Sequence, residues 1–522
     1  MEMKRPAKRF ESTLKQTLGT ENFSKTYLRV DSGEIAGAAK MFVSASLAKA
    51  DKFKGEGESP NRQNFEMGIA STSNQKVEWE VYGIYNKSKE HKYKGLTYQE
   101  SQDLSKYKDL DYQTTNPHSS DYYDFNRQDF DTYTLFGKIK VPLSIDSSLM
   151  LKPYFLNDSG HSYSTSGSNV MDWLVDHNTY GAVLEYALKM ENSKIKIGYW
   201  YQEDEPPGPP TSRKIRDTNL QFIKWERIIG VEKNHTFSAP YITYEKRFDK
   251  TLFEAGVKYL WLSSPSLVSY STAGIGDVSY QEALSQVNSV NFTLNSNTYE
   301  LFLPNLGVTH YFNDNSSLKM SYGKNYNTPN YSFGGSMISY FSKPTIDQQV
   351  LQNMWNNLKP EESNNFDLGY SYETRKGFIS TTLFYSLIKN VGGNLYDPVL
   401  NMNYQQNTAE ARSYGLELGA GYKLLDNLST NFSFTYTNYA FTTDIQSAAG
   451  ASIQSKGNQL PDVPELMGNI SAVYEKDGYK IAPVLRYLGK RYVDVENKHS
   501  VKAHYLVDIS LNKEIPLSEK QK

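Results

Sequence analysis

One stretch of the chain gathers basic side chains that could attract an anion. Residues 211–233 contain Arg213, Lys214, Arg216, Lys224, Arg227 and Lys233. Positive charge at this density attracts a negatively charged metal chelate over long range. A solvated, charged loop is the alternative explanation. We take Arg213, Arg216 and Arg227 as candidate ligand-binding residues.

Two further stretches are rich in aromatic side chains, whose rings can stack on a flat ligand. They read DYYDFNRQDFDTY at 121–133 and NYSFGGSMISYFSKP at 330–344. The alternative is that the rings pack within loops or lie in an interfacial girdle. The candidates for ligand contact are Tyr123, Phe125, Tyr331, Phe333, Tyr340 and Phe341.

Residue patterns typical of catalysis or of metal binding are not recognisable. The chain has no cysteine, and His91, His118, His161 and His177 lack the close spacing of metal ligands. The acidic run from Asp121 to Asp131 lacks the spacing and glycine of a calcium loop. No nucleophile elbow is present. We therefore predict no catalytic residue, no metal site, no cofactor and no enzyme activity.

Strict alternation of apolar and polar residues indicates the elements that carry these loops. In the segment FDLGYSYE, Phe366, Leu368, Tyr370 and Tyr372 fall on one side and small or charged residues on the other. A period of two is that of a β-strand. Only 38% of the chain is hydrophobic, and it has no apolar run near the roughly 18 residues of a membrane helix.

About twenty alternating segments recur along the chain. They span 8–19, 23–31, 40–49, 62–72, 75–87, 130–142, 147–158, 178–190, 193–203, 235–247, 250–263, 297–312, 315–326, 362–374, 377–389, 402–423, 427–441, 465–475, 478–489 and 502–514.

The connections between these segments alternate between short and long. Tight turns are expected at Ser73-Asn74, near Asp146, at 191–193, Asp249, 313–315, 374–377, Asp426-Asn427 and Asp477-Gly478. Long connections are expected at 88–129, 159–177, 204–234, 264–296, 327–361 and 442–464. In an up-and-down antiparallel sheet, alternate connections emerge at the same end. The short turns should therefore lie at one end of the sheet and the long loops at the other.

These features predict an all-β fold, a large antiparallel up-and-down transmembrane barrel. Its apolar face would contact lipid and its polar face would line the lumen. Tyrosine is abundant, with 41 residues, as expected of the interfacial girdles of such barrels. A string of soluble β-domains, with the apolar face buried, is the alternative.

Several stretches resemble the TonB-dependent outer-membrane receptors. Each motif is weak alone, but their order and spacing are similar to the family over most of the chain. The matching stretches are residues 27–59, SSLKMSYGKNYNTP at 316–329, LKPEESNNFDLGYSYE at 358–373, residues 411–441 and GNQLPDVPELMGNISAVYE at 457–475.

The resemblance also sets expectations about domains. Family members carry a signal peptide, a segment that contacts the energy-transducing protein and a plug domain before the barrel, and they end on an aromatic residue. None of these is recognisable here. We expect residues 1–522 to be a receptor-like barrel domain truncated at both ends, with about 20 strands of a roughly 22-strand barrel.

The resemblance implies the outer membrane as location and transport as function. It implies a ferric siderophore or similar small iron complex as ligand, outer-membrane lipid as surroundings and a TonB-type energy-transducing complex as partner. Nucleic acid is not expected, because the aromatic strands lack interleaved basic residues. A passive porin-like channel and a receptor for haem, a vitamin or an oligosaccharide are the alternatives. Haem is disfavoured because YNTP at 326–329 and NNLKP at 356–360 keep only part of the haem-receptor motifs.

Overall fold

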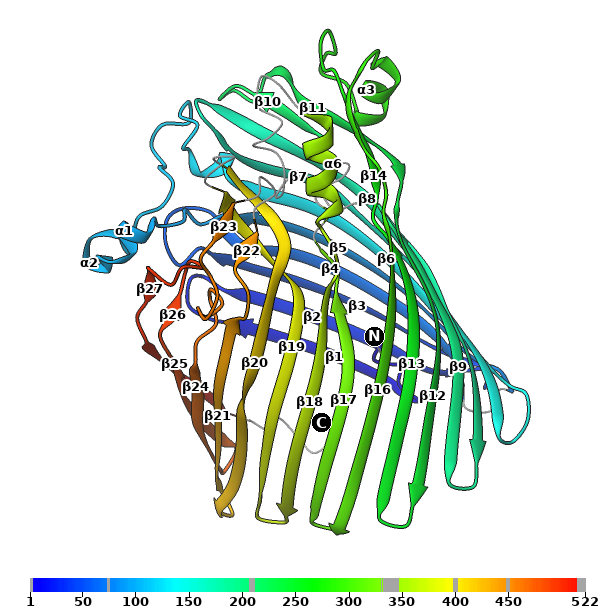
Figure 1. Ribbon diagram of the computed structural model, residues 1–522. Helices are drawn as coiled ribbons and strands as arrows, with labels where there is room; N and C mark the ends of the chain where they lie inside the picture. Colours follow the sequence, from blue (N-terminus) through cyan, green and yellow to red (C-terminus); the bar gives the residue numbers. More distant parts are fainter. Residues whose placement is uncertain are drawn as a thin grey trace.

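A computed structural model describes residues 3–72, 76–205, 212–329, 331, 347–397, 402–446 and 451–513 of the chain. Within them, one antiparallel sheet of 24 strands dominates. Twenty of these strands form a continuous wall, and the other four, β10, β11, β14 and β15, extend it at one end. Figure 1 shows the wall strands side by side in a surface that curves round on itself.

The wall strands follow one another in chain order, and each pairs with its predecessor and its successor. They are β1 (Phe10–Leu18), β2 (Ser24–Ile35), β3 (Ala39–Asp51), β4 (Glu58–Ser71), β5 (Glu78–His91), β6 (Arg127–Pro142), β7 (Ser147–Ser166), β8 (Asn169–Met190), β9 (Ser193–Asp204), β12 (His235–Phe248), β13 (Thr251–Ser263), β16 (Thr298–Asn313), β17 (Ser316–Asn327), β18 (Glu361–Thr374), β19 (Gly377–Asp397), β20 (Met402–Leu425), β21 (Leu428–Phe441), β24 (Leu466–Lys476), β25 (Tyr479–Leu488) and β28 (His504–Lys513).

The remaining elements lie in the long connections. They are β10 (Arg213–Arg216), β11 (Phe222–Lys233), β14 (Ser266–Tyr270), β15 (Val290–Leu294), β22 (Ile445–Gln446), β23 (Ser452–Ile453), β26 (Arg491–Tyr492), β27 (Ser500–Val501), α1 (Tyr98–Ser101), α2 (Leu104–Tyr107), the 3-10 helix η1 (Tyr123–Phe125), α3 (Tyr280–Gln286) and α6 (Gln348–Asn356).

All twenty predicted segments are confirmed as wall strands, with boundaries that move by a few residues at most ends. The tight turn predicted at Asp477-Gly478 is confirmed. Asp477 and Gly478, between β24 and β25, both have positive φ, 51° and 77°. Two such residues form the turn whose twist matches a two-residue hairpin. The turn predicted at Ser73-Asn74 lies outside the described residues.

The long loop predicted at 159–177 is wrong. Strand β7 runs on to Ser166 and β8 begins at Asn169, and their residues pair continuously to the hairpin end. The extra length mixes polar residues, such as Ser159 and Ser162, with apolar ones, such as Val170 and Leu174, without strict alternation. A strand that projects beyond the lipid no longer needs a continuous apolar outer face, so the alternation that marks the rest of the wall disappears there.

The two faces of the wall differ sharply in polarity. One row of directly opposed residues crosses eight neighbouring strands and is apolar throughout: Phe253, Val308, Met320, Leu368, Leu383, Leu416, Tyr436 and Leu466. Leu383 is 53% exposed and Met320 58%. A neighbouring row on the opposite face is polar: Thr309, Lys319, Gly369, Thr382, Glu417 and Thr435.

This polarity excludes a soluble sandwich, because the apolar side chains cover the outside of the curved sheet and do not meet in a dry interior. It matches a barrel wall that contacts lipid outside and water inside. Among the described residues, no helix has the length and apolar character needed to cross a membrane.

The first and last wall strands are the edges of the sheet. In the described chain, β1 pairs with β2 and β28 pairs with β25, and no pairing joins β1 to β28. The described strands therefore form a curved sheet with two free edges.

We predict that a charge placed on the apolar face destabilises the wall, whereas the same charge on the polar face does not. Leu383→Arg should lower the free energy of unfolding in lipid vesicles by about 2–4 kcal/mol, because a guanidinium would lie in hydrocarbon. Thr382→Arg, one residue away, is the matched control and should change it by less than about 1 kcal/mol. Urea titration of the vesicle-inserted protein measures both, and equal losses would contradict the assignment of faces.

Candidate functional site

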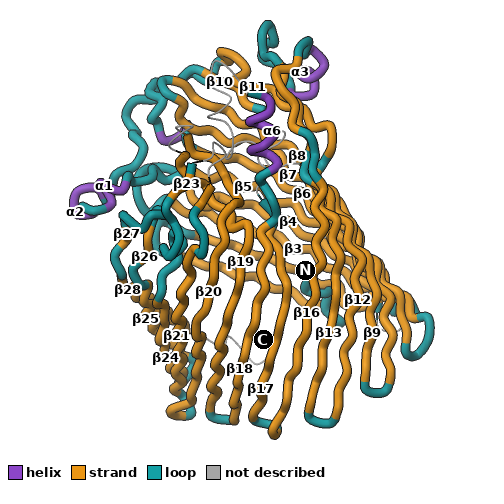
Figure 2. The backbone as a smooth tube through the Cα atoms, in the orientation of Figure 1, coloured by secondary structure: helices purple, strands orange, loops and turns teal. Residues whose placement is uncertain are grey.

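The long connections build a second layer of structure at one end of the wall. Figure 2 shows most loops and helices gathered at the end opposite the tight turns. The extension of β8 beyond the wall gives β10 a partner, and β11, β14 and β15 then pair in turn. We call these four short strands the rim sheet.

Register shows which rim side chains face the lumen side. On β8, Tyr180 and Leu184 lie on the lipid side, so odd-numbered residues such as Trp173 lie on the lumen side. Arg213 opposes Trp173 across one ladder and Arg227 across the other. Directly opposed residues of an antiparallel pair share a face. Arg213, Arg227 and Trp173 therefore lie together on the lumen side.

These two arginines are buried and close to each other. Arg213 is 6% exposed and Arg227 8%. Glu226 Oε2 lies 3.9 Å from Arg213 Nη1 and 3.9 Å from Arg227 Nη2, so both share one distant carboxylate. The Arg213 guanidinium stacks 4.9 Å over the Trp173 ring and donates from Nη1 to Met171 Sδ at 3.1 Å. In the described chain, Arg213 Nε has no hydrogen-bond partner.

Burial of these cations changes their acidity. Burial lowers the pKa of Arg213, and burial together with the charge of Arg213 lowers the pKa of Arg227 to about 9. Both effects disfavour the charged form, because a buried cation loses its hydration and repels its like-charged neighbour.

A third cation comes from a loop far away in the sequence. Lys92, just after β5, donates from Nζ to Ser162 Oγ and to the Tyr163 carbonyl oxygen, each at 2.8 Å. Burial, and next the charge of Arg213, lowers the pKa of Lys92. We call Lys92, Arg213 and Arg227 the cation cluster. Sequence reasoning missed Lys92 because nothing in its local pattern links it to residue 213.

Arg216 does not join this cluster, although the sequence grouped it with Arg213 and Arg227. It opposes Val170 on the outer side of the rim sheet. There its Nε lies 2.8 Å from Asp172 Oδ2 and its Nη1 lies 3.2 Å from Asp277 Oδ2. Lys214 Nζ lies 2.6 Å from Asp277 Oδ1 on the same side. These cations are neutralised by carboxylates that hold the α3 connection to the sheet.

The aromatic candidates of the first loop lie in η1. The Phe125 ring is buried and packs edge-on against Tyr122 at 5.7 Å. The Tyr123 ring is half-buried, 5.3 Å from the His91 ring. Phe125 therefore serves loop packing, whereas Tyr123 keeps part of its surface open.

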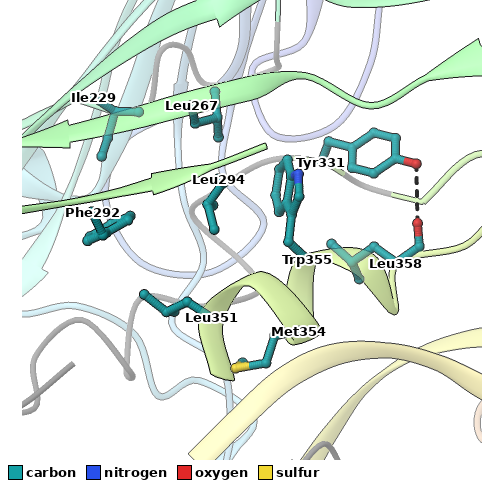
Figure 3. Packing of buried hydrophobic residues seen from close by; sticks show 9 residues of the cluster. All are labelled: Ile229, Leu267, Phe292, Leu294, Tyr331, Leu351, Met354, Trp355 and Leu358. Carbon is teal, nitrogen blue, oxygen red and sulfur yellow. Dashed lines mark hydrogen bonds between the residues drawn. The ribbon is translucent and has the colours of Figure 1, made fainter. Parts of the chain in front are cut away.

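Tyr331 is buried in a hydrophobic cluster built on α6. The cluster joins Ile229, Leu267, Phe292 and Leu294 of the rim sheet to Leu351, Met354, Trp355, Leu358 and Tyr331, as Figure 3 shows. The Tyr331 hydroxyl donates to the Leu358 carbonyl oxygen at 3.2 Å. This position agrees with the loop-packing alternative. Phe333, Tyr340 and Phe341 lie outside the described residues.

The cluster sits on the lumen side, next to the arginines. Ile229 follows Arg227 by two residues on β11 and so shares its face. Asp347 caps α6, accepting from the backbone amides of Gln349 and Val350. The helix therefore packs across the inner side of the rim sheet, at the mouth of the wall (Figure 1).

Metal binding finds no support in the part of the chain that is described, where no group of three or more suitable ligands occurs. The acidic run of the first loop is used in ion pairs. Asp121 pairs with Lys94 at 2.8 Å, Asp124 with Arg127 at 2.8 Å and Asp129 with Arg127 at 3.0 Å.

Comparison with known proteins gives the same architecture. The family described as "TonB dependent receptor-like, beta-barrel" matches residues 49–520. The chain belongs to this family. Among its relatives is the ferrioxamine receptor of Yersinia enterocolitica, to which it is 27% identical over 195 residues. This match covers 35% of this chain and 25% of the relative. It is 23% identical over 288 residues to the ferrichrome outer membrane transporter/phage receptor of Escherichia coli K12, covering 54% of this chain and 32% of the relative.

Solved structures share the fold of this TonB-dependent receptor barrel. The ferric yersiniabactin uptake receptor of Yersinia pestis superposes with a TM-score of 0.72 at 15% identity, covering 97% of this chain and 73% of that one. The matches to the two curated relatives span only about a quarter to a third of their length.

We predict that Trp355 anchors α6 in the mouth. Trp355→Ala removes a fully buried ring, and loss of such a ring costs about 3–5 kcal/mol. Amide hydrogen exchange across residues 348–358 should therefore become much faster, while the amides of β18 and β19 stay protected. Gln349→Ala, on the exposed side of the same helix, is the control. Similar exchange in both variants would show that the cluster does not hold the helix.

Proposed function

We propose that this chain forms the wall and ligand-binding mouth of an outer-membrane receptor that imports a ferric siderophore or a similar small iron complex. The observation that carries the proposal is the contrast between the two ends of the wall. One end has tight turns, and the other has a rim sheet, a packed helix and buried cations on the lumen side. A wall built only for passive diffusion has no need of such a mouth.

The family and the relatives support the same function. The relatives named above are a ferrioxamine receptor and a ferrichrome transporter, and the fold matches a ferric yersiniabactin receptor. In this proposal residues 1–522 act as the barrel domain in the bacterial outer membrane. A TonB-type complex supplies the energy for import, and the chain itself carries out no catalysis.

Iron uptake in the native bacterium tests the proposal. Under iron limitation, deletion of the gene should abolish uptake of radioactive iron from at least one ferric chelate, and a plasmid copy should restore it. Uptake should stop when the proton-motive force is collapsed, because import against a gradient needs energy. Unchanged uptake of every chelate, together with slower entry of small sugars, would favour a passive porin. Loss of haem, vitamin or oligosaccharide uptake alone would identify another nutrient.

A further inference from the structure

We propose that the wall carries a binding site for one anionic phospholipid, on the lipid-facing side of β18–β21 at the end with the tight turns. The lipid phosphate would contact Arg375 and Lys376 in the turn between β18 and β19, and an acyl chain would lie in a groove over Ala420. The inference goes beyond the proposed function, because it concerns the wall and not the cargo. It requires only that the wall lies in a membrane.

The turn between β18 and β19 differs in charge from the other tight turns, which lie at the end of the wall opposite α6 (Figure 1). In the described chain, seven turns of two to four residues join wall strands between β6 and β25. Six of them contain a carboxylate: Asp146, Glu191, Asp249, Asp314, Asp426 and Asp477. The seventh is Arg375-Lys376. This dibasic turn is therefore a place on an otherwise acidic rim where an anion is attracted.

The charge of the dibasic turn is not neutralised by neighbouring carboxylates. Arg375 and Lys376 are both exposed, and neither forms an ion pair with a residue that the structure describes. Lys423 lies beside them, since its backbone amide donates to the Lys376 carbonyl oxygen at 2.7 Å. Its own Nζ, however, lies 3.3 Å from Asp426 Oδ1. Two cations of the turn thus remain available to a ligand.

A groove of about 370 Å³ adjoins this turn on the lipid-facing side of the wall. Thr374 and Gly377, which flank the two cations, both line it. A row of directly opposed residues crosses the groove from β18 to β24: Tyr372, Ile379, Ala420, Phe432 and Ile470. The four large side chains of the row are 42–52% exposed. The small Ala420 between them leaves a depression with apolar walls.

The depth of the groove suits an acyl chain whose phosphate lies at the turn. Ile379 is two residues from Gly377, a rise of about 7 Å at roughly 3.3 Å per residue. Each leaflet contributes about 15 Å to a hydrocarbon layer of about 30 Å. The groove therefore lies within the leaflet next to the turns, which is the periplasmic leaflet for a barrel of this kind. Tyr372 and Tyr422 line the groove, and tyrosine rings are favoured at the level of the headgroups.

The combination of charge and apolar surface selects a lipid with a net negative headgroup. A water-soluble anion would use the two cations but gain nothing from a groove that opens into hydrocarbon. A zwitterionic lipid would fill the groove but bring its own cation to the basic turn. An anionic phospholipid uses both parts of the site.

Native mass spectrometry of the purified, delipidated full-length chain in detergent tests the inference. The protein would be titrated with dioleoyl-phosphatidylglycerol, which is anionic, and with dioleoyl-phosphatidylcholine, which has the same chains and is zwitterionic. The first phosphatidylglycerol should bind about fivefold or more tightly than the first phosphatidylcholine, since each cation near anionic lipid changes binding roughly fivefold. This preference should shrink as the concentration of ammonium acetate rises.

Charge variants identify the headgroup contact. Arg375→Gln combined with Lys376→Gln should weaken phosphatidylglycerol binding by about 5- to 30-fold and leave phosphatidylcholine binding unchanged. Lys250→Gln is the matched control, because Lys250 is an exposed cation in the turn between β12 and β13, away from the groove. It should change the affinity by less than about twofold.

Groove variants identify the place of the acyl chain. Ala420→Trp fills the depression with an apolar ring and should weaken phosphatidylglycerol binding by about fivefold or more, because the chain loses its contact area. Ala182→Trp is the control, since Ala182 shares the lipid-facing side of β8 with Tyr180 and Leu184. Ala420→Leu serves where Ala420→Trp fails to fold, and urea titration of each variant checks the fold.

Three results would overturn the inference. The first is equal affinity for the two lipids, or unchanged phosphatidylglycerol binding without the two cations of the turn. The second is an equal loss in Lys250→Gln, which would mean that charge anywhere on the rim suffices. The third is full binding in both Ala420 variants alongside a loss in the charge variant, which would point to a soluble anion or an acidic peptide. None of these results bears on iron uptake, so the proposed function stands or falls separately.

Discussion

The need to satisfy every backbone hydrogen bond in hydrocarbon is the constraint on which the rest of this structure depends. An unpaired amide or carbonyl in lipid costs several kcal/mol, so only a continuous ladder of strands can serve as a wall. Between the two edge strands, β1 and β28, the described wall meets this need by pairing in chain order with few irregularities. Pairing in this manner fixes which residues share a face. The apolar outer row through Leu368 and Leu383 and the polar inner row through Gly369 and Thr382 both follow from it.

The rim sheet continues the same ladder of strands beyond the apolar band, where the backbone no longer lies in hydrocarbon. Beyond the apolar band, water can satisfy backbone groups, and strands no longer need an apolar face. There β7 and β8 continue as a hairpin without strict alternation, and β8 supplies the edge on which the rim sheet forms. The register of that sheet places Arg213 on the lumen side and Arg216 on the outer side. One short strand thus supplies a cation to the mouth and another to the outer scaffold.

The wall could be predicted from sequence almost completely, and the mouth only in part. Alternation is a local signal with a period of two, so each strand can be recognised without its neighbours. Loss of alternation above the membrane hid the outer halves of β7 and β8. The rim strands are as short as four residues in β10, and α6 spans nine, so their patterns are too brief to stand out. Their positions are set by tertiary pairing that a local pattern does not encode.

The candidate residues divide in the same way. The basic stretch was recognised by composition, but its division between Arg213 and Arg216 depends on register at a strand edge. Lys92 reaches the cluster from more than a hundred residues away, through Ser162. Tyr331 was recognised as aromatic and near the mouth, yet its ring packs on Trp355 at 5.5 Å. Composition thus predicted the residue types, and only the fold shows which of them converge.

The most direct test of the central claim is an accessibility scan along one wall strand. The chain has no native cysteine, so single cysteines can be placed at each of residues 380–385 of β19 and labelled with an environment-sensitive fluorophore. In lipid vesicles, a quencher carried on the acyl chains should act at 381, 383 and 385, and a water-soluble quencher at 380, 382 and 384. Uniform quenching along the strand, or the reverse alternation, would contradict a wall with lipid outside and water inside.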